Sequence, residues 1–221
     1  GDDEIMKHWQ HGTNALVIDR KQISSKISES PWPNDIPVAF RSMTKRKEIW
    51  KCWETGRPFY YIDNGYMGNL MKKKKYYRVV SEKPCQFYNI DKNTWLKETK
   101  TELRKYTDRP IIIREKGLRP DRIKDNSVAA QCAREQIHSV VTYQSMAALE
   151  AMHYGIPAFT TALSCVDSVV NRNLADIENP SYPAEDEFLN LLHYLAYCQY
   201  TLDEINRGEA LSMIERMKLY D

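Results

Sequence analysis

The sequence has few cysteines and none in a recognisable pattern. Its five cysteines stand singly, with no pair separated by two residues: Cys52, Cys85, Cys132, Cys165 and Cys198. An odd, dispersed set of this kind argues against a disulfide framework or a zinc cluster and is typical of a reducing compartment. We therefore expect a cytoplasmic location. The five histidines also lack the spacing of metal ligands, so the sequence predicts no metal site.

Long apolar runs are missing as well. No stretch approaches the roughly 20 apolar residues that a membrane-spanning helix requires. The acidic and polar start, GDDEIMKHWQHG, does not have the composition of a signal peptide. The chain contains neither GxxxxGK[ST] nor GxGxxG, so nothing supports a P-loop or a dinucleotide-binding motif. We predict a protein without a membrane span.

An excess of one charge is absent too. The 32 basic and 30 acidic residues give a net charge of +2, which demands no nucleic acid partner. One dense basic run, KKKKYYR from Lys72 to Arg78, departs from this balance. Such a run is either a solvated face or a surface for phosphate or a polyanion, with tyrosines available for stacking. Both alternatives stay open from the sequence.

What the chain does contain is an alternation of apolar strands and helical patterns. Strands are predicted at 15–19, 38–40, 58–63, 74–80, 110–116, 139–143 and 158–162, and helices at 44–56, 93–106, 127–136, 145–155 and from 184 onward. The rest of residues 1–35 is predicted to be weakly ordered. Repeated strand–helix units form right-handed crossovers and parallel sheets. We therefore expect the α/β class, with two small Rossmann-like lobes at 1–105 and 106–221, parallel sheets and long C-terminal helices.

The stretch VTYQSMAALEAMHYGIPAF contains the strongest candidate site. In open parallel sheets, ligands bind beyond the carboxyl ends of the strands, where loops meet helix N-termini. The loop from Thr142 to Ser145 occupies such a position, and its hydroxyls would bind an anion or merely cap the helix. Glu150 follows within the helix. Its carboxylate either lies on the solvated face or binds the hydroxyls of a ligand such as a ribose.

Two further loops follow predicted strands. Arg114 and Lys116 come at the end of PIIIREK, predicted to be a buried strand, where both could meet a diphosphate or simply be solvated. In YIDNGYMGN, Asp63 stands at a strand end and could act as a general base. Gly65 and Gly68 permit a close backbone approach there, although any turn has the same composition.

The segment SVVTYQSMAALEAMHYGIPAF resembles the nucleotide-sugar-binding segment of GT-B glycosyltransferases and their epimerase-like relatives. The family's EA…G.P pattern matches Glu150, Ala151, Gly155 and Pro157. The retaining branch usually carries a second glutamate where this chain has Thr142. That difference makes the chain more similar to the capsular-polysaccharide-synthesis type of bacteria and bacteriophages. YYIDNGYMG, YYRVV, DRPIIIREK and LAYCQYTLDEINRGEA follow in the order seen in that type, so the similarity covers residues 36 to 210.

The basic run Lys72–Lys75 beside Tyr76 and Tyr77 would suit a polyanionic acceptor, either an acidic polysaccharide or modified DNA. The resemblance implies a compact enzyme that transfers a sugar from a nucleotide-sugar donor to an acceptor. It needs no cofactor or metal. The resemblance places Asp63 to Gly68 on the acceptor side, and Asp63, because it stands at a strand end, is the predicted catalytic base. The acceptor side would be formed by Asn64, Gly65, Tyr66 and Arg78, and the donor side by Arg114, Lys116, Thr142, Gln144, Ser145 and Glu150. A complete enzyme of this family is usually longer, which leaves a non-catalytic binding protein on a degenerate GT-B scaffold as the alternative.

Overall fold

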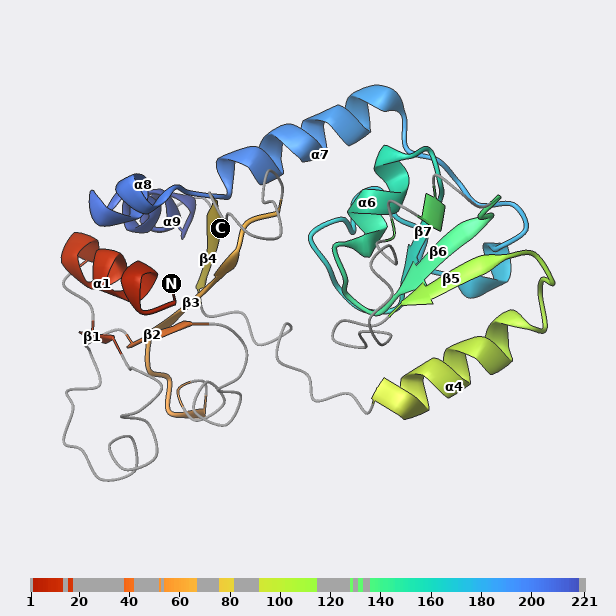
Figure 1. Ribbon diagram of the computed structural model, residues 1–221, viewed down its shortest axis with the longest axis horizontal. Coiled ribbons are helices and arrows are strands. Elements are labelled where there is room, and N and C mark those ends of the chain that lie inside the picture. Colours follow the sequence, from red (N-terminus) through yellow and green to blue (C-terminus); the bar gives the residue numbers. More distant parts are fainter. Residues whose placement is uncertain are drawn as a thin grey trace. The chain divides into compact units, whose positions relative to one another are not determined.

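The computed structural model describes residues 2–13, 16–17, 38–41, 52, 54–66, 76–81, 92–114, 128, 131–132 and 136–218 (Figure 1). The chain divides into two compact units. Unit 1 comprises Gly1–Tyr88 together with Tyr194–Asp221, and unit 2 comprises Asn89–His193. These boundaries differ from the expected 1–105 and 106–221, because the C-terminal segment belongs to unit 1 and the helix near residue 100 belongs to unit 2.

Unit 1 contains a four-stranded sheet in the order β1-β2-β3-β4. Its strands are Leu16–Val17, Val38–Arg41, Phe59–Asn64 and Tyr77–Ser81. The first three are parallel, as expected, but β4 runs antiparallel to β3. A parallel return needs a crossover that covers the sheet, usually a helix. Only 12 residues, 65–76, connect β3 to β4, which is at the lower limit for a parallel crossover and explains the difference.

Three of the described helices belong wholly to unit 1: α1 (Asp2–Thr13), α8 (Leu202–Asn206) and α9 (Glu209–Lys218). The expectation of weak order near the N-terminus was wrong for α1. Ile5, Met6 and Trp9 share one face of this helix and are buried. They join one core with residues of the sheet and of the C-terminal helices, among them Ile62 and Ile205. The core therefore ties the two ends of the chain together.

Unit 2 contains a parallel three-stranded sheet, β5-β6-β7, formed by Ile111–Arg114, Ser139–Thr142 and Ala158–Thr160. Val141 and Phe159 pack in a core with Leu103 of α4 (Lys92–Leu103) and Ile177, which follows η3 (Leu174–Asp176). Helix α6 (Ala147–His153) also contacts β6 and β7 (Figure 1). A parallel sheet in contact with helices of the same unit is compatible with a small Rossmann-like fold.

Strand β5 corrects one detail of the expected sheet. Its isoleucines, at 111–113, are half-buried, and among the described strands β5 pairs with β6 alone. The run of three isoleucines predicted a fully buried strand. Ile111 and Ile113 instead pack against the edge of the core cluster.

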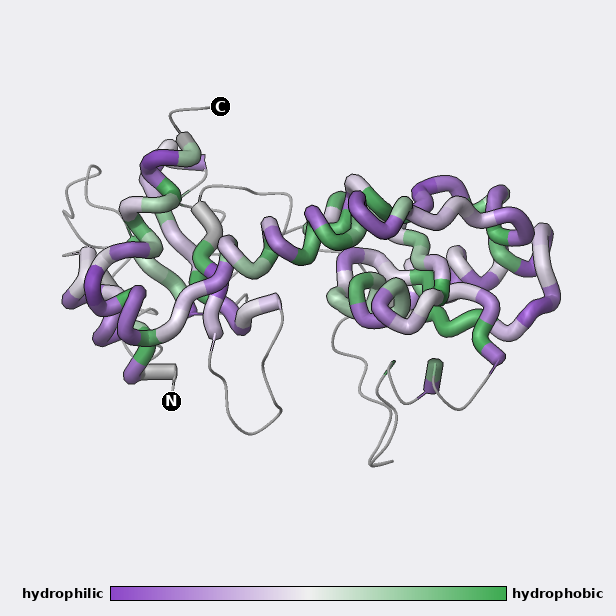
Figure 2. The backbone as a smooth tube through the Cα atoms, turned by 90° about the horizontal axis from the view of Figure 1, so that it is seen from above, coloured by the Kyte–Doolittle hydropathy of each residue, from purple (hydrophilic) through white to green (hydrophobic). Residues whose placement is uncertain are grey.

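The helix ends follow the sequence signals. Gly155 has φ +71°, its N–H bonds to Met152 O, and the Ile156 N–H bonds to Ala151 O, so a Schellman motif ends α6 as Gly155 predicted. The C-terminal tail is three helices, beginning with α7 (Glu185–Tyr197). A capping box of Thr201 and Glu204 restarts the chain as α8. Figure 2 shows that hydrophobic and hydrophilic residues alternate along the helices. Most of the predicted helices at 44–56 and 127–136, and Lys72–Lys75, lie outside the described residues.

Candidate functional site

The carboxyl ends of the three unit 2 strands lie in register. Arg114 pairs with Thr142, and Thr142 pairs with Thr160, so the last residues of β5, β6 and β7 form one row. The described loops, which follow β6 and β7, emerge at the same end of the sheet. We call this row and the loops at 142–145 and 160–167 the carboxyl end of the sheet. It brings the backbone of Arg114 together with Thr142, Gln144 and Ser145, whereas Lys116 lies outside the described residues.

The loop after β6 is held by its own hydroxyl groups. Thr142 Oγ1 accepts a hydrogen bond from the Ser145 N–H at 2.8 Å, and Ser145 Oγ accepts one from the Ala147 N–H at 3.2 Å. Thr142 is fully buried. In this conformation Thr142 therefore positions the loop. It does not cap α6, because that helix begins at Ala147 with Met146 as its N-cap and without a side-chain cap hydrogen bond. The half-buried Ser145 hydroxyl keeps its own O–H for donation to a ligand.

The loop after β7 is joined to the loop after β6. The N–H groups of Thr161 and Ala162 bond to the carbonyls of Thr142 and Tyr143, and Gln144 Nε2 donates to Leu163 O at 2.8 Å. These bonds continue the parallel pairing beyond the strands. The two loops consequently form one surface, and Gln144 contributes to holding it together.

Helix α4 supports this surface through a tryptophan. The buried Trp95 donates from Nε1 to Thr161 Oγ1 at 2.9 Å, and its ring meets that of Tyr143 edge-on at 6.0 Å. The sequence analysis missed this role. Trp95 was visible as an apolar position of a predicted helix, but its partner lies 66 residues away.

Glu150 lies in the first turn of α6, the short helix that begins beside this surface. Its neighbours Leu149 and Ala151 are buried, whereas Glu150 is exposed. An exposed acid there is accessible to ligand hydroxyls, and it also interacts favourably with the helix N-terminus. The geometry therefore permits both alternatives for Glu150: a place on the solvated face of the helix, or binding of ligand hydroxyls such as those of a ribose.

A second polar cluster lies at the ends of β2, β3 and β4 in unit 1. Asp63 Oδ2 accepts hydrogen bonds from Tyr61 Oη at 2.8 Å and from Arg78 Nη2 at 3.1 Å, while Asp63 Oδ1 lies 3.6 Å from Arg41 Nη1. Arg41 also donates to Ile62 O and to Asn64 Oδ1. All three charged side chains are largely buried. Asp63 therefore stabilises a buried ion cluster, and Arg41 is a member that the sequence analysis missed.

The environment of this cluster shifts the pKa values of two members. Burial, and then the Asp63 charge, raise the pKa of the Tyr61 phenol well above its usual range. Burial lowers the pKa of the Arg78 guanidinium, but Tyr61, Tyr66 and Asp63 outweigh it and raise that pKa. Tyr61 thus stays protonated and Arg78 charged at neutral pH. The Arg78 guanidinium also stacks on the Tyr66 ring at 5.0 Å.

Gly65 follows Asn64 of this cluster, and the space at its Cα leaves little room for a side chain. A Cβ at this position would lie 2.8 Å from Gln199 Oε1 and 3.0 Å from Tyr76 Cβ. The close approach predicted for Gly65 is therefore present, whereas Gly68 lies outside the described residues. The predicted acceptor-side residues Asn64, Gly65, Tyr66 and Arg78 occur together at this end of the unit 1 sheet.

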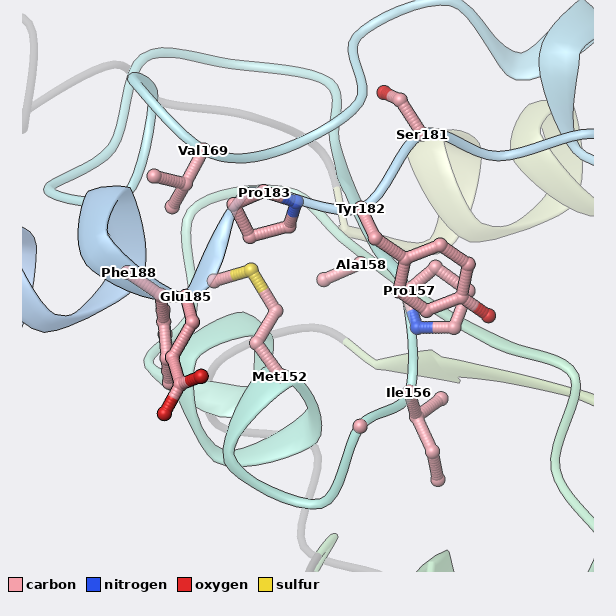
Figure 3. Close-up of a pocket in the computed structure, with 11 residues that line it drawn as sticks. Met152, Ile156, Pro157, Ala158, Val169, Ser181, Tyr182, Pro183, Glu185 and Phe188 are labelled. Atoms are coloured by element: carbon pink, nitrogen blue, oxygen red, sulfur yellow. The ribbon is translucent and has the colours of Figure 1, made fainter.

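A pocket of about 200 Å³ lies at the opposite, amino end of β7. Figure 3 shows Met152 projecting into it towards Pro183, with Val169 and Phe188 around it and the Glu185 carboxylate beside Phe188. Its lining is mostly apolar. Because a diphosphate needs cationic or N–H partners, this pocket does not suit the charged part of a nucleotide, and the carboxyl end of the sheet remains the candidate site.

Among the described residues, no helix is long and apolar enough to cross a membrane, and no group of three or more His, Cys, Asp or Glu side chains could hold a metal ion. Comparison of the chain with protein-family models, curated proteins and solved structures found no match. The GT-B resemblance therefore stays a prediction.

Proposed function

We propose that unit 2 binds a nucleotide sugar at the carboxyl end of its sheet and that the protein transfers the sugar to a polysaccharide or modified-DNA acceptor. The observation that carries this proposal is the row of Arg114, Thr142 and Thr160, which gathers three strand ends and two joined loops. Ligands of open parallel sheets bind in this position.

The residues of the site fall into three roles: diphosphate binding, loop positioning and ribose binding. The Ser145 O–H and the side chains of Arg114 and Lys116 bind the diphosphate, because hydroxyl and cationic groups are the partners that phosphate oxygens prefer. Thr142 and Gln144 hold the loops in place through the bonds described above. Glu150 accepts hydrogen bonds from the ribose hydroxyls.

The proposed reaction breaks the bond between the anomeric carbon of the sugar and the diphosphate oxygen. An acceptor hydroxyl oxygen forms the new bond to that carbon, its proton passes to a base, and the nucleoside diphosphate, or the monophosphate of a CMP-linked donor, leaves with the electron pair. Cationic side chains that bind the leaving diphosphate more strongly as its charge develops lower the barrier. Asp63 is the residue predicted as this base from its position at a strand end.

Calorimetry with UDP-, GDP-, ADP- and CMP-linked sugars tests the proposal. We expect the wild-type protein to bind one nucleotide class, and Glu150→Ala to weaken that binding about tenfold through loss of the ribose contact. His153→Ala is a matched control, because His153 is exposed on the same helix. Absence of binding to any nucleotide sugar, or equal binding by wild type and Glu150→Ala, would contradict the assignment.

A non-catalytic binding protein on the same scaffold is the second candidate. It is favoured by the contacts of Asp63, whose two oxygens face Tyr61, Arg78 and Arg41. A carboxylate engaged in this way is a poor acceptor for a substrate proton. Binding of a nucleotide sugar without hydrolysis or transfer to any acceptor would identify this function. A gel-shift series on duplex DNA at rising salt tests the DNA acceptor, because phosphate contacts give a steep salt dependence.

A further inference from the structure

We infer that Arg172 is an anion-binding residue at the carboxyl end of the unit 2 sheet and that it takes a phosphate group through its Nε and Nη2 N–H groups. Arg172 was not among the residues that the sequence singled out. The identity of the phosphate as part of a nucleotide sugar rests on the proposed function, whereas the anion contact rests on the geometry below.

The backbone places Arg172 beside the last residue of β7. Asn171 forms a parallel bridge with Phe159, its N–H bonds to Ala158 O, and the Thr160 N–H bonds to Asn171 O. The chain at Asn171 thus extends the sheet by one more parallel position. Arg172 comes next, so it occupies the same end of the sheet as Thr142 and Thr160.

This position is fixed by a buried asparagine. The Asn171 side chain donates to Ala158 O and Ser181 O, and it accepts from the Ser181 N–H and hydroxyl. The backbone that carries Arg172 is therefore held from both sides. A guanidinium on such a support loses little freedom when it binds a ligand.

Within the part of the chain that the structure describes, the Arg172 side chain makes its hydrogen bonds through one guanidinium nitrogen, Nη1. Nη1 donates to Thr160 Oγ1 at 2.9 Å and to Ala162 O at 2.6 Å, and it lies 3.2 Å from Asp167 Oδ1. These contacts fix the plane of the group. Nε and Nη2 form the other donor edge, and 43% of the side chain is exposed.

The nearby acid does not cancel this donor edge. Asp167 Oδ1 also accepts hydrogen bonds from the Ser164 N–H at 2.9 Å and the Ser164 hydroxyl at 3.1 Å. The carboxylate of Asp167 is therefore hydrogen-bonded to Ser164 as well as to Arg172, and its contact with Arg172 is at Nη1. The two parallel N–H groups on the outer edge match two oxygens of a phosphate, which is the bidentate geometry that distinguishes arginine from lysine.

The test is calorimetry with inorganic pyrophosphate, followed by the nucleotide-sugar panel, on wild type, Arg172→Ala, Arg172→Lys and Arg109→Ala. We expect Arg172→Ala to weaken pyrophosphate binding about 10- to 100-fold, as for loss of charge-assisted hydrogen bonds. Arg172→Lys keeps the charge and a donor for the Thr160 anchor but lacks the paired edge, so we expect about a tenfold loss.

Arg109→Ala is the matched control, because Arg109 precedes β5 at the amino end of the sheet and pairs with Glu178 while its side chain is 57% exposed. It removes the same charge, and we expect it to bind pyrophosphate as wild type does. Equal losses in Arg109→Ala and Arg172→Ala, or wild-type affinity in Arg172→Lys, would overturn the inference. If Arg172→Ala fails to fold, Arg172→Lys decides.

The two proposals fail in different ways. Loss of pyrophosphate binding in the Arg172 variants, with no nucleotide sugar bound by the wild type, supports the anion site and contradicts the proposed function. Nucleotide-sugar binding that depends on Glu150 but not on Arg172 contradicts the inference alone. A wild-type protein that binds neither probe contradicts both.

Discussion

At the scale of single residues, Asp63 and Glu150 are acids in opposite situations. Asp63 is largely buried between two arginines and a tyrosine hydroxyl, whereas Glu150 is exposed on a helix whose other early residues are buried. Removing a buried counter-charge leaves guanidinium groups uncompensated, which costs far more than removing an exposed acid. Asp63 therefore has a role in stability whether or not it takes part in catalysis.

We predict that Asp63→Asn lowers the free energy of unfolding of unit 1 by about 3 kcal/mol, because Arg41 and Arg78 lose their shared carboxylate. Urea denaturation followed by circular dichroism measures this. The control is Glu102→Gln, which removes an exposed acid paired with Lys105 and should leave stability unchanged. A variant Asp63→Asn as stable as wild type would show that the cluster is not structural.

The residues of the candidate site were predictable to different degrees. Ser145 and Glu150 follow from a loop and a helix that are contiguous in sequence. The structure places Ser145 beside the end of β6 and Glu150 exposed in the first turn of α6. Arg172 was not predictable, because its position depends on the bridge between Asn171 and Phe159 and on acceptors 5 to 12 residues earlier in the chain. No local pattern of residue types signals such a bridge.

At the scale of elements, α1 and α8 approach each other unusually closely. A Cβ at Gly12 would meet the Ile205 carbonyl oxygen and would lie 2.9 Å from Asn206 O. Gly208, with φ +77°, faces Gly12 O in turn. His8 Nδ1 adds a contact of 3.0 Å to Asn206 Oδ1. These backbone contacts need glycine and hold the C-terminal helices on the N-terminal one.

Gly12→Ala should therefore destabilise unit 1 by about 3 kcal/mol, because a methyl group would push two backbones apart. Gly56→Ala is the comparison. Gly56 has φ +68°, and no atom of the described residues lies within 4 Å of the added Cβ, so only a conformational cost of about 1 kcal/mol applies. Chemical denaturation of both variants measures the difference. Equal losses would mean that the α1–α8 contact is not tight.

Most strands were predictable because short apolar runs bounded by turn residues have few other solutions. Helix α1 was missed because its buried face consists of only a few apolar residues among charged and polar ones, and its burial depends on Ile205 and Ile214 from the far end of the chain. The direction of β4 was missed because alternation alone does not distinguish a crossover from a reversal.

At the scale of the whole molecule, unit 1 is discontinuous in sequence. Its core combines Ile5 and Trp9 from the N-terminus, strand residues, and Tyr200, Ile205 and Ile214 from the C-terminus. Unit 2 is a single stretch with its own core around Val141 and Phe159. The two cores therefore depend differently on the integrity of the chain ends.

A chain ending at His193 should lose the fold of unit 1 and keep that of unit 2. Hydrogen exchange followed by mass spectrometry measures this, with faster exchange expected in α1, β2 and β3 because their apolar partners are missing. Exchange in β6 and β7 should match the full-length protein. Unchanged protection of α1 in the truncated chain would contradict the assignment of the C-terminal helices to the unit 1 core.

The central claim, that a nucleotide sugar binds at the carboxyl end of the unit 2 sheet, is tested most directly by backbone amide chemical-shift mapping. The full-length protein is titrated with the nucleotide sugar that binds in calorimetry, and in parallel with pyrophosphate. We predict that the largest shifts occur at residues 142–145, 161–164 and 172, where the strand ends and joined loops lie. Shifts confined to residues 155–158 and 181–188, around the apolar pocket, or no shifts in unit 2, would contradict the claim.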